Sequence, residues 1–275
     1  MRVSIQGYEG SFHQEAARRF FGEEVQVIPC DTFREVVRVA SSRTESDGGV
    51  MAIENSIAGS ILPNYELLAK SNLLVTGEVY LQIRQHLLVN PGVGLEDIRE
   101  VHSHPMAIQQ CIDYLDRHRW KLVESEDTAL SAKRLRQHKS RHTAAIASRL
   151  AAELFGLKIL APNIHTLRNN HTRFLILRRR PDAKEVPDAD KASIRFSTDH
   201  SRGSLARVLS CIAEGGINLS KLQSVPIPGS DFKYGFHADL EFDDLDRYRN
   251  VMDSLEKLTD EVKALGIYKR GVLTK

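Results

Sequence analysis

The feature that most constrains the fold is a repeated alternation of short apolar runs with amphipathic runs. Arg2–Gln6 is typical of a strand, Gly7–Ser11 of a glycine-bearing turn, and His13–Phe21 of a helix with one apolar face. Strands that alternate with helices favour an α/β fold, in which a largely parallel sheet is covered on both sides.

The alternation continues to about residue 180. The predicted strands are Val25–Ile28, Gly49–Ile53, Glu78–Val89, Glu100–Ser103, Lys121–Glu124, Ala144–Ala147 and Asn170–Arg178. The predicted helices are Phe33–Ser41, with Asp31-Thr32 as its N-cap, Pro105–His118, Asp127–Arg136 and Ser148–Phe155. Two α/β groups joined by long connections predict two lobes with a ligand-binding cleft between them.

A change in composition separates a second domain. Residues 178–190 contain two prolines, mixed charges and almost no large apolar residue, which is typical of a linker. Beyond it the pattern predicts strand Ala192–Thr198, helix Gly203–Glu214, strands Asn218–Pro226 and Tyr234–Phe242, helix Leu245–Ala264 and a short strand near Ile267-Tyr268. This order is the βαββαβ, ferredoxin-like arrangement. The expected boundaries are 1–180 (second lobe about 82–162), linker 181–191, and 192–275.

Charge and cysteine content exclude several classes of function. The chain has 38 basic and 36 acidic residues and a formal net charge of +2, which argues against a nucleic-acid or membrane partner held by bulk charge. Cys30, Cys111 and Cys211 form no metal-binding or disulfide pattern, and neither a signal segment nor an apolar run of about 18 residues is present. Nucleotide-binding loops and metal-ligand spacings are missing. We expect a cytoplasmic protein that acts on a small molecule without cofactor or metal.

Three polar runs follow predicted strands. Glu54–Ser60 places a carboxylate, an amide and two hydroxyls around Gly59, where backbone N–H groups can hold a carboxylate, although a helix cap explains it equally well. Ser103–Cys111 can be explained by Ser103 as an N-cap, but its paired glutamines need partners if they are buried.

The third run is Asn169–Phe174. Its Arg173 suits either a substrate carboxylate or an internal acid. Its Thr172, taken alone, is better explained as a β-forming residue.

Five motifs occur in the order found in prephenate dehydratases. They are G-Y-E-G-S-F (Gly7–Phe12), E-N-S-I-A-G-S (Glu54–Ser60), S-H-P (Ser103–Pro105), D-T-A (Asp127–Ala129) and T-R-F (Thr172–Phe174). The chain therefore resembles that family over nearly its whole length. The C-terminal runs Gly203–Leu209 and Gly216–Leu222 resemble an ACT domain.

The resemblance implies a periplasmic-binding-protein-like catalytic domain that makes phenylpyruvate from prephenate in a cleft. Its catalytic residues would be Thr172, Asn55, Gln110 and Ser103. Its substrate-binding residues would be Glu54, Ser56, Gly59, Ser60, Arg173, Phe174, Gly10 and Ser11. Two alternatives stay open, namely arogenate dehydratase and a protein of the same fold that only binds a small molecule.

The ACT-like tail implies feedback by L-phenylalanine in a homodimer or tetramer. The effector site would be formed by Gly203, Ser204, Leu205, Asn218 and Leu219. The family's E-S-R-P run reads Gln223-Ser224-Val225-Pro226 here, so two charged groups are replaced. We expect phenylalanine to bind more weakly than in relatives that have the full motif.

Overall fold

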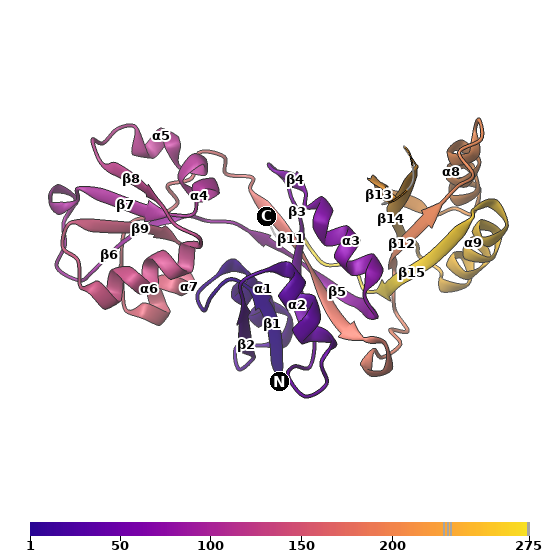
Figure 1. The fold of residues 1–275 in the computed structure, drawn as a ribbon, viewed down its shortest axis with the longest axis horizontal. Helices are drawn as coiled ribbons and strands as arrows, with labels where there is room; N and C mark the ends of the chain where they lie inside the picture. The colour runs from indigo at the N-terminus through magenta and orange to yellow at the C-terminus, as the bar shows by residue number, and fades with distance from the viewer. Residues whose placement is uncertain (228, 230, 232, 274–275) are drawn as a thin grey trace.

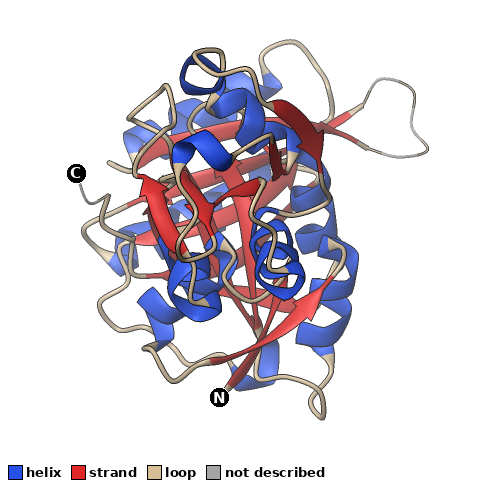
Figure 2. Ribbon diagram, turned by 90° about the vertical axis from the view of Figure 1, so that its left-hand side faces the viewer, coloured by secondary structure: helices blue, strands red, loops and turns tan. Residues whose placement is uncertain are grey.

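The computed structural model describes residues 1–227, 229, 231 and 233–273. Two α/β lobes and a C-terminal βαββαβ domain lie in a row, with the first lobe in the middle (Figure 1). A view from the side shows strands running through the interior and helices on the outside (Figure 2). The predicted fold class is confirmed.

The first lobe has a mixed sheet of order β2-β1-β3-β11-β5, with β4 paired to β3. Its elements are β1 (Arg2–Gln6), α1 (Phe12–Phe21), β2 (Gln26–Cys30), α2 (Phe33–Ser41), β3 (Gly49–Asn55), β4 (Gly59–Ser60), α3 (Leu62–Lys70), β5 (Leu73–Gln82) and β11 (His171–Arg179). β1 runs parallel to β2 and β3, whereas β11 is antiparallel to both β3 and β5. The prediction of a largely parallel sheet was wrong here, because the chain leaves the lobe through β5 and returns through β11.

The second lobe has a sheet of order β10-β6-β9-β7-β8. Its elements are β6 (His86–Val89), η1 (Leu95–Asp97), β7 (Glu100–Ser103), α4 (Pro105–Gln110), α5 (Ile112–Leu115), β8 (Lys121–Glu124), α6 (Thr128–His138), β9 (Thr143–Ala147), α7 (Arg149–Phe155) and β10 (Lys158–Ala161). An apolar cluster that includes Leu87, Val101 and Ile146 fills its interior.

The C-terminal domain follows η2 (Arg180–Asp182). Its elements are β12 (Lys191–Ser197), α8 (Ser204–Glu214), β13 (Asn218–Pro226), β14 (Tyr234–Glu241), α9 (Leu245–Leu258) and β15 (Glu261–Tyr268), in the sheet order β13-β14-β12-β15. Strand β15 lies against β5 of the first lobe. The βαββαβ order is confirmed.

Several element predictions need correction. The segment Glu78–Val89 is not one strand, because the chain passes between the lobes at residues 83–85 and thus divides it into β5 and β6. The helix predicted over Pro105–His118 is interrupted at Cys111, whose backbone (φ −110°, ψ 11°) lies outside the helical region. The helix predicted to end at Ala264 ends at Leu258, because the alternating residues of β15 pair with β12. Helix α3 and strand β10 were missed.

The starts of the helices are set by local capping. Ser11, Asp127 and Ser148 accept hydrogen bonds from the first turns of α1, α6 and α7. For α4 the prediction of Ser103 as the cap was wrong. His104 is the cap, and its Nδ1 accepts from the Met106 amide, while Ser103 is the last residue of β7.

Candidate active site

A cleft of about 280 Å³ lies between the two lobes and holds several of the predicted residues. First-lobe residues form one wall, residues of the connecting segment form the base, and second-lobe residues form the other wall. The first-lobe wall consists of Gln6, Ser11, Phe12, His13, Phe33, Ala52, Asn55, Ile61, Thr172 and Phe174. The connecting segment contributes Ile83 and Gln85. The second-lobe wall consists of His104, Met106, Ala107, Gln110, Glu126, Asp127 and Thr128.

Thr172 and Asn55 are directly opposite each other on the antiparallel strands β11 and β3. The Asn55 Nδ2 group donates to the Thr172 hydroxyl oxygen over 3.0 Å and to Asn170 Oδ1 over 2.7 Å. The orientation of the amide is fixed, because Asn55 Oδ1 accepts from the backbone N–H groups of Ile57 and Ala58, which can only donate.

This arrangement determines what the Thr172 hydroxyl can do. Its oxygen already accepts a hydrogen bond from Asn55, so its own O–H remains available to donate. The side chain lines the cleft and is 9% exposed, and a donor held in a largely dry site is stronger than one in water. Thr172 is therefore a positioned hydrogen-bond donor.

Three more of the predicted residues lie in the cleft. Ser11 caps α1, Phe174 packs its ring edge-on against His13 with 4.9 Å between centroids, and Gln110 comes from α4 of the second lobe. The structure thus brings together Thr172, Asn55, Gln110, Ser11 and Phe174, from three separate elements (β3, α4 and β11) and the turn before α1.

Other predicted residues lie outside the cleft. The hydroxyl of Ser103 is fully buried and donates to the Ile146 carbonyl, inside the second-lobe sheet. Gly10 is buried at the contact between the lobes, where its carbonyl accepts from Ser148 Oγ over 2.6 Å. Ser56 links the loop after β3 to β11 by donating to Asn169 O and accepting from the His171 amide. Gly59 is exposed, with φ +82°.

Arg173, Glu54 and Ser60 face the C-terminal domain. Of the two interpretations of Arg173, the geometry matches the internal one, because its guanidinium is 5% exposed and bonds to Glu78 and Asp239. Glu54 and Ser60 both bond to the ammonium of Lys221, at 2.6 and 2.9 Å.

The cleft is bordered by helix amino ends and lacks lysine and arginine among its described lining residues. Burial lowers the pKa of His13, which also lines it, to about 3. Four helices, α1, α2, α4 and α6, begin at its wall. Helix amino ends carry partial positive charge and free N–H groups, so the backbone can provide binding groups for a carboxylate here.

The sequence predictions missed the acidic residues of the cleft. Glu126 and Asp127 lie in the second-lobe wall, and burial raises the pKa of Asp127 although backbone N–H groups oppose the shift. The D-T-A motif contained Asp127, but the motif alone did not show that it faces the site. Gln6 and Gln85 carried no sequence signal, since only the fold places them there.

A second cavity of about 360 Å³ adjoins the cleft and shares Met106 and Gln110 with it. Its wall is mostly apolar, with Ile57, Ile112 and Leu167. Asn170 also lines it, and this 1% exposed residue has an Nδ2 group without a hydrogen-bond partner. The cavity extends the candidate site with room for an apolar group.

The predicted effector residues form two groups at opposite ends of α8 in one copy of the chain, with Gly203, Ser204 and Leu205 at its amino end and Asn218 and Leu219 just beyond its carboxyl end. Gly203 has φ +79° and precedes α8, where Ser204 bonds to Thr198 and Leu205 packs on the domain core. Asn218 begins β13 and donates to Glu241 Oε2, while the neighbouring Leu219 also packs on that core.

Residues 1–227, 229, 231 and 233–273 contain no group of three or more His, Cys, Asp or Glu side chains placed to hold a metal ion. Within the same ranges no helix has the length and apolar character that crossing a bilayer requires.

The fold and the cleft define a two-lobed α/β ligand-binding protein with a C-terminal ferredoxin-like domain. Comparison with known proteins identifies its family. The family described as "PDT: Prephenate dehydratase" matches residues 3–182. An Arabidopsis thaliana protein named arogenate dehydratase/prephenate dehydratase 2, chloroplastic, is 36% identical over 98% of this chain and 72% of the relative.

Two solved structures agree over nearly the whole chain. A prephenate dehydratase in complex with L-Phe from Arthrobacter aurescens has a TM-score of 0.86 and 27% identity, covering 98% of this chain and 90% of that one. A protein described as GqqA, a novel type of quorum quenching acylases, has a TM-score of 0.88 and 30% identity, covering 98% of each chain. The chain belongs to the prephenate dehydratase family. Its relatives in that family support a dehydratase activity, which is a type of lyase activity.

Proposed function

We propose that this chain is a prephenate dehydratase, which converts prephenate to phenylpyruvate, carbon dioxide and water. The bond to the ring carboxylate breaks, its electron pair makes the ring aromatic, and the ring hydroxyl leaves with a proton as water. Aromatisation drives the reaction, so the protein has to hold a dianion and assist the departure of the hydroxyl.

The observation that carries this proposal is the hydrogen bond from Asn55 to Thr172. It fixes the Thr172 hydroxyl as a donor toward the cleft, where that donor can stabilise the leaving oxygen. The hydroxyl is too weakly acidic to give up its proton outright, so the proton that completes the water comes from solvent. The helix amino ends around the cleft would hold the carboxylates.

The test is formation of phenylpyruvate by the purified protein, with prephenate and arogenate assayed side by side. We expect turnover of prephenate without added metal or nucleotide. Binding of both compounds without turnover of either would contradict the proposal and would favour a protein that only binds its ligand.

Arogenate is the second candidate substrate, and one observation favours it. Arogenate differs from prephenate by an ammonium in place of the keto group, and Glu126 and Asp127 present carboxylates to the cleft. If arogenate is the substrate, Glu126→Gln should lower kcat/KM for arogenate several-fold and leave prephenate turnover nearly unchanged. Glu126 forms an ion pair with the exposed Arg134 on the surface, so the change should leave the fold intact.

The cleft does not favour the acylase activity named for one structural neighbour. A serine or threonine nucleophile needs a neighbouring base. Among the described residues of the cleft, the Thr172 hydroxyl bonds to the Asn55 amide and the Ser11 hydroxyl caps α1, so neither hydroxyl is paired with a base. The Nε2 atom of His13 accepts from the Ala52 amide, and the Nδ1 atom of His104 accepts from the Met106 amide. We expect no release of fatty acid from N-acyl amides.

We further propose that L-phenylalanine binds the C-terminal domain between two copies of the chain. The Arthrobacter relative, whose complex contains L-Phe, supports this. Within the described residues β13 is the edge of the C-terminal sheet that has no neighbouring strand, since the other edge, β15, lies against β5. Gly203 leaves the amino end of α8 open to a small ligand.

Gln223 and Val225 stand where the family motif has charged residues, and these replacements should weaken phenylalanine binding. Within the described residues the Gln223 side chain bonds to the neighbouring Ser224 carbonyl, and Val225 packs on the first-lobe core. Calorimetry with phenylalanine, tyrosine and tryptophan, combined with sedimentation of the intact protein, is the test. Absence of heat and of inhibition at millimolar phenylalanine would contradict it.

A further inference from the structure

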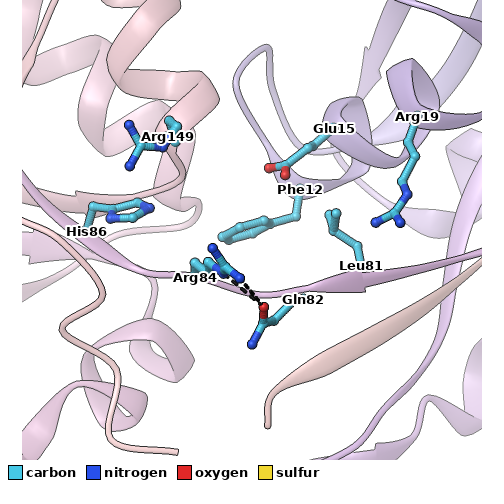
Figure 3. A pocket seen from close by; sticks show the side chains of 8 residues that line it. All are labelled: Phe12, Glu15, Arg19, Leu81, Gln82, Arg84, His86 and Arg149. Atoms are coloured by element: carbon cyan, nitrogen blue, oxygen red, sulfur yellow. Dashed lines mark hydrogen bonds between the residues drawn. The ribbon is translucent and has the colours of Figure 1, made fainter. Parts of the chain in front are cut away.

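A basic cavity lies behind the segment that joins the lobes, on the side away from the candidate site. It measures about 270 Å³ and is lined by Phe12, Glu15, Arg19, Leu81, Gln82, Arg84, His86 and Arg149 (Figure 3). Gln82, Arg84 and His86 face this cavity, whereas Ile83 and Gln85 face the cleft, as expected of an extended segment. Among the described residues, Phe12 is the one that lines both the cavity and the cleft.

The charge of this cavity differs from that of the cleft. Arginines reach it from three elements, Arg19 from α1, Arg84 from the connecting segment and Arg149 from α7 (Figure 3). Two of these charges act on His86, since burial first, followed by Arg149, His165 and Arg84, lowers its pKa to about 4. His86 is therefore neutral at pH 7. Its Nδ1 accepts from the Asn163 amide, so its Nε2 carries the proton and is a donor.

Two of the arginines have no acidic partner. Arg84 is oriented by a neutral group, because its Nε and Nη2 both donate to Gln82 Oε1, at 2.9 and 2.6 Å. The guanidinium of Arg149 forms no hydrogen bond or ion pair with any described residue. It also occupies the first position of α7, where the helix dipole disfavours a cation. A fixed guanidinium fork and an unpaired one suit an oxyanion.

The rest of the cavity wall is partly apolar, which indicates that the ligand also has an apolar part. The rings and chains of Phe12 and Leu81 give an apolar surface beside the arginines (Figure 3). The Glu15 carboxylate forms no ion pair within the described residues, so it does not neutralise the cavity by contact.

We propose that this cavity is a second ligand site, which binds a small organic dianion with carboxylate or phosphate groups on an apolar frame. Residues of both lobes would contact the ligand, and Phe12 would transmit its presence to the cleft.

The test is calorimetry on the intact protein with phthalate, phenyl phosphate and inorganic phosphate, at constant ionic strength. We expect the two aromatic dianions to bind more tightly than inorganic phosphate, because Phe12 and Leu81 contact their rings. The relative affinity of phthalate and phenyl phosphate identifies the preferred acidic group. No binding of any of the three would overturn the proposal.

Variants locate the site. Arg149→Gln and Arg84→Gln should each weaken binding about tenfold or more, as loss of a charge-assisted bond does. Arg119→Gln, an exposed arginine of the same lobe, is the matched control and should change affinity by less than about twofold. Glu15→Gln should tighten binding several-fold by removing a repelling charge. Loss of binding in Gln110→Ala, with no effect of Arg149→Gln, would place the probes in the cleft and overturn the proposal.

Discussion

The two sides of the β3–β11 pair differ in chemistry although they are one residue apart. Thr172 opposite Asn55 faces the cleft, and Arg173 opposite Glu54 faces the C-terminal domain. The cleft pair is neutral and linked by one hydrogen bond, whereas the opposite side is built on buried charge. Because side chains alternate along a strand, the strand that positions the candidate donor also anchors the second domain.

The buried charges form a connected network. Arg173 bonds to Glu78, Asp239 and the Tyr268 hydroxyl, and Lys191 bonds to the other oxygen of Glu78 at 3.0 Å. Burial would raise the pKa of Asp239, but the charge and hydrogen bond of Arg173 lower it overall. The C-terminal domain therefore contacts the residue next to Thr172, and a change in that domain has a short path to the site.

The largest effect is expected at Thr172. Thr172→Ala should lower turnover by roughly two to four orders of magnitude, the range for losing a positioned donor. The Asn55 amide keeps its bonds to Asn170 and the His171 carbonyl, so stability should change little. Steady-state assays and thermal unfolding measure both. Thr172→Ser is the control that keeps the hydroxyl and should retain more activity, while near-normal turnover in Thr172→Ala would remove it from the mechanism.

Arg173→Met should show the opposite behaviour, with a loss of stability as its primary effect. Removing one partner leaves Glu78 and Asp239 charged and buried, which costs about 3–5 kcal/mol. Urea unfolding measures this. The control is Arg38→Met, whose exposed pair with Glu45 should contribute less than about 1 kcal/mol. Equal stability of the two variants would contradict the distinction between the two sides.

A pH effect should also arise on the C-terminal side. His237 lies against Tyr65, and burial first, then Arg195, lowers its pKa to about 4. In the unfolded chain His237 takes up a proton near pH 6.5, whereas in the folded chain it does so only near pH 4. The free energy of unfolding therefore decreases as pH falls between these two values. The contribution is up to about 3 kcal/mol. His237→Gln should flatten this part of the stability profile, and the exposed His138→Gln should not.

The smallest effect is expected for Lys221, which joins β13 to Glu54 and Ser60. Lys221→Met should cost only about 1 kcal/mol, because the pair is partly open to solvent. Its more useful readout is inhibition by phenylalanine, which should weaken more than basal turnover changes. Unchanged inhibition would show that coupling between the domains does not pass through this contact.

The sequence alone determined the parts of this protein that depend on local pattern. Apolar periodicity predicted the two α/β lobes and the βαββαβ tail, and the capping residues Thr32 and Asp127 start the helices that they were expected to start. Motif order gave the family and placed Thr172, Asn55 and Gln110, which the structure brings to one cleft. Such signals are carried by neighbouring residues, so they can be read without the fold.

Only the tertiary structure decided which side each motif residue faces. Register and the change of lobe at residues 83–85 placed Arg173 and Glu54 against the C-terminal domain and buried Ser103 in the second-lobe sheet. The same crossing placed Arg84 and Arg149, which are distant in sequence, around one basic cavity. Pairings between distant segments depend on how sheets pack and cross, and residue spacing along the chain does not contain that information.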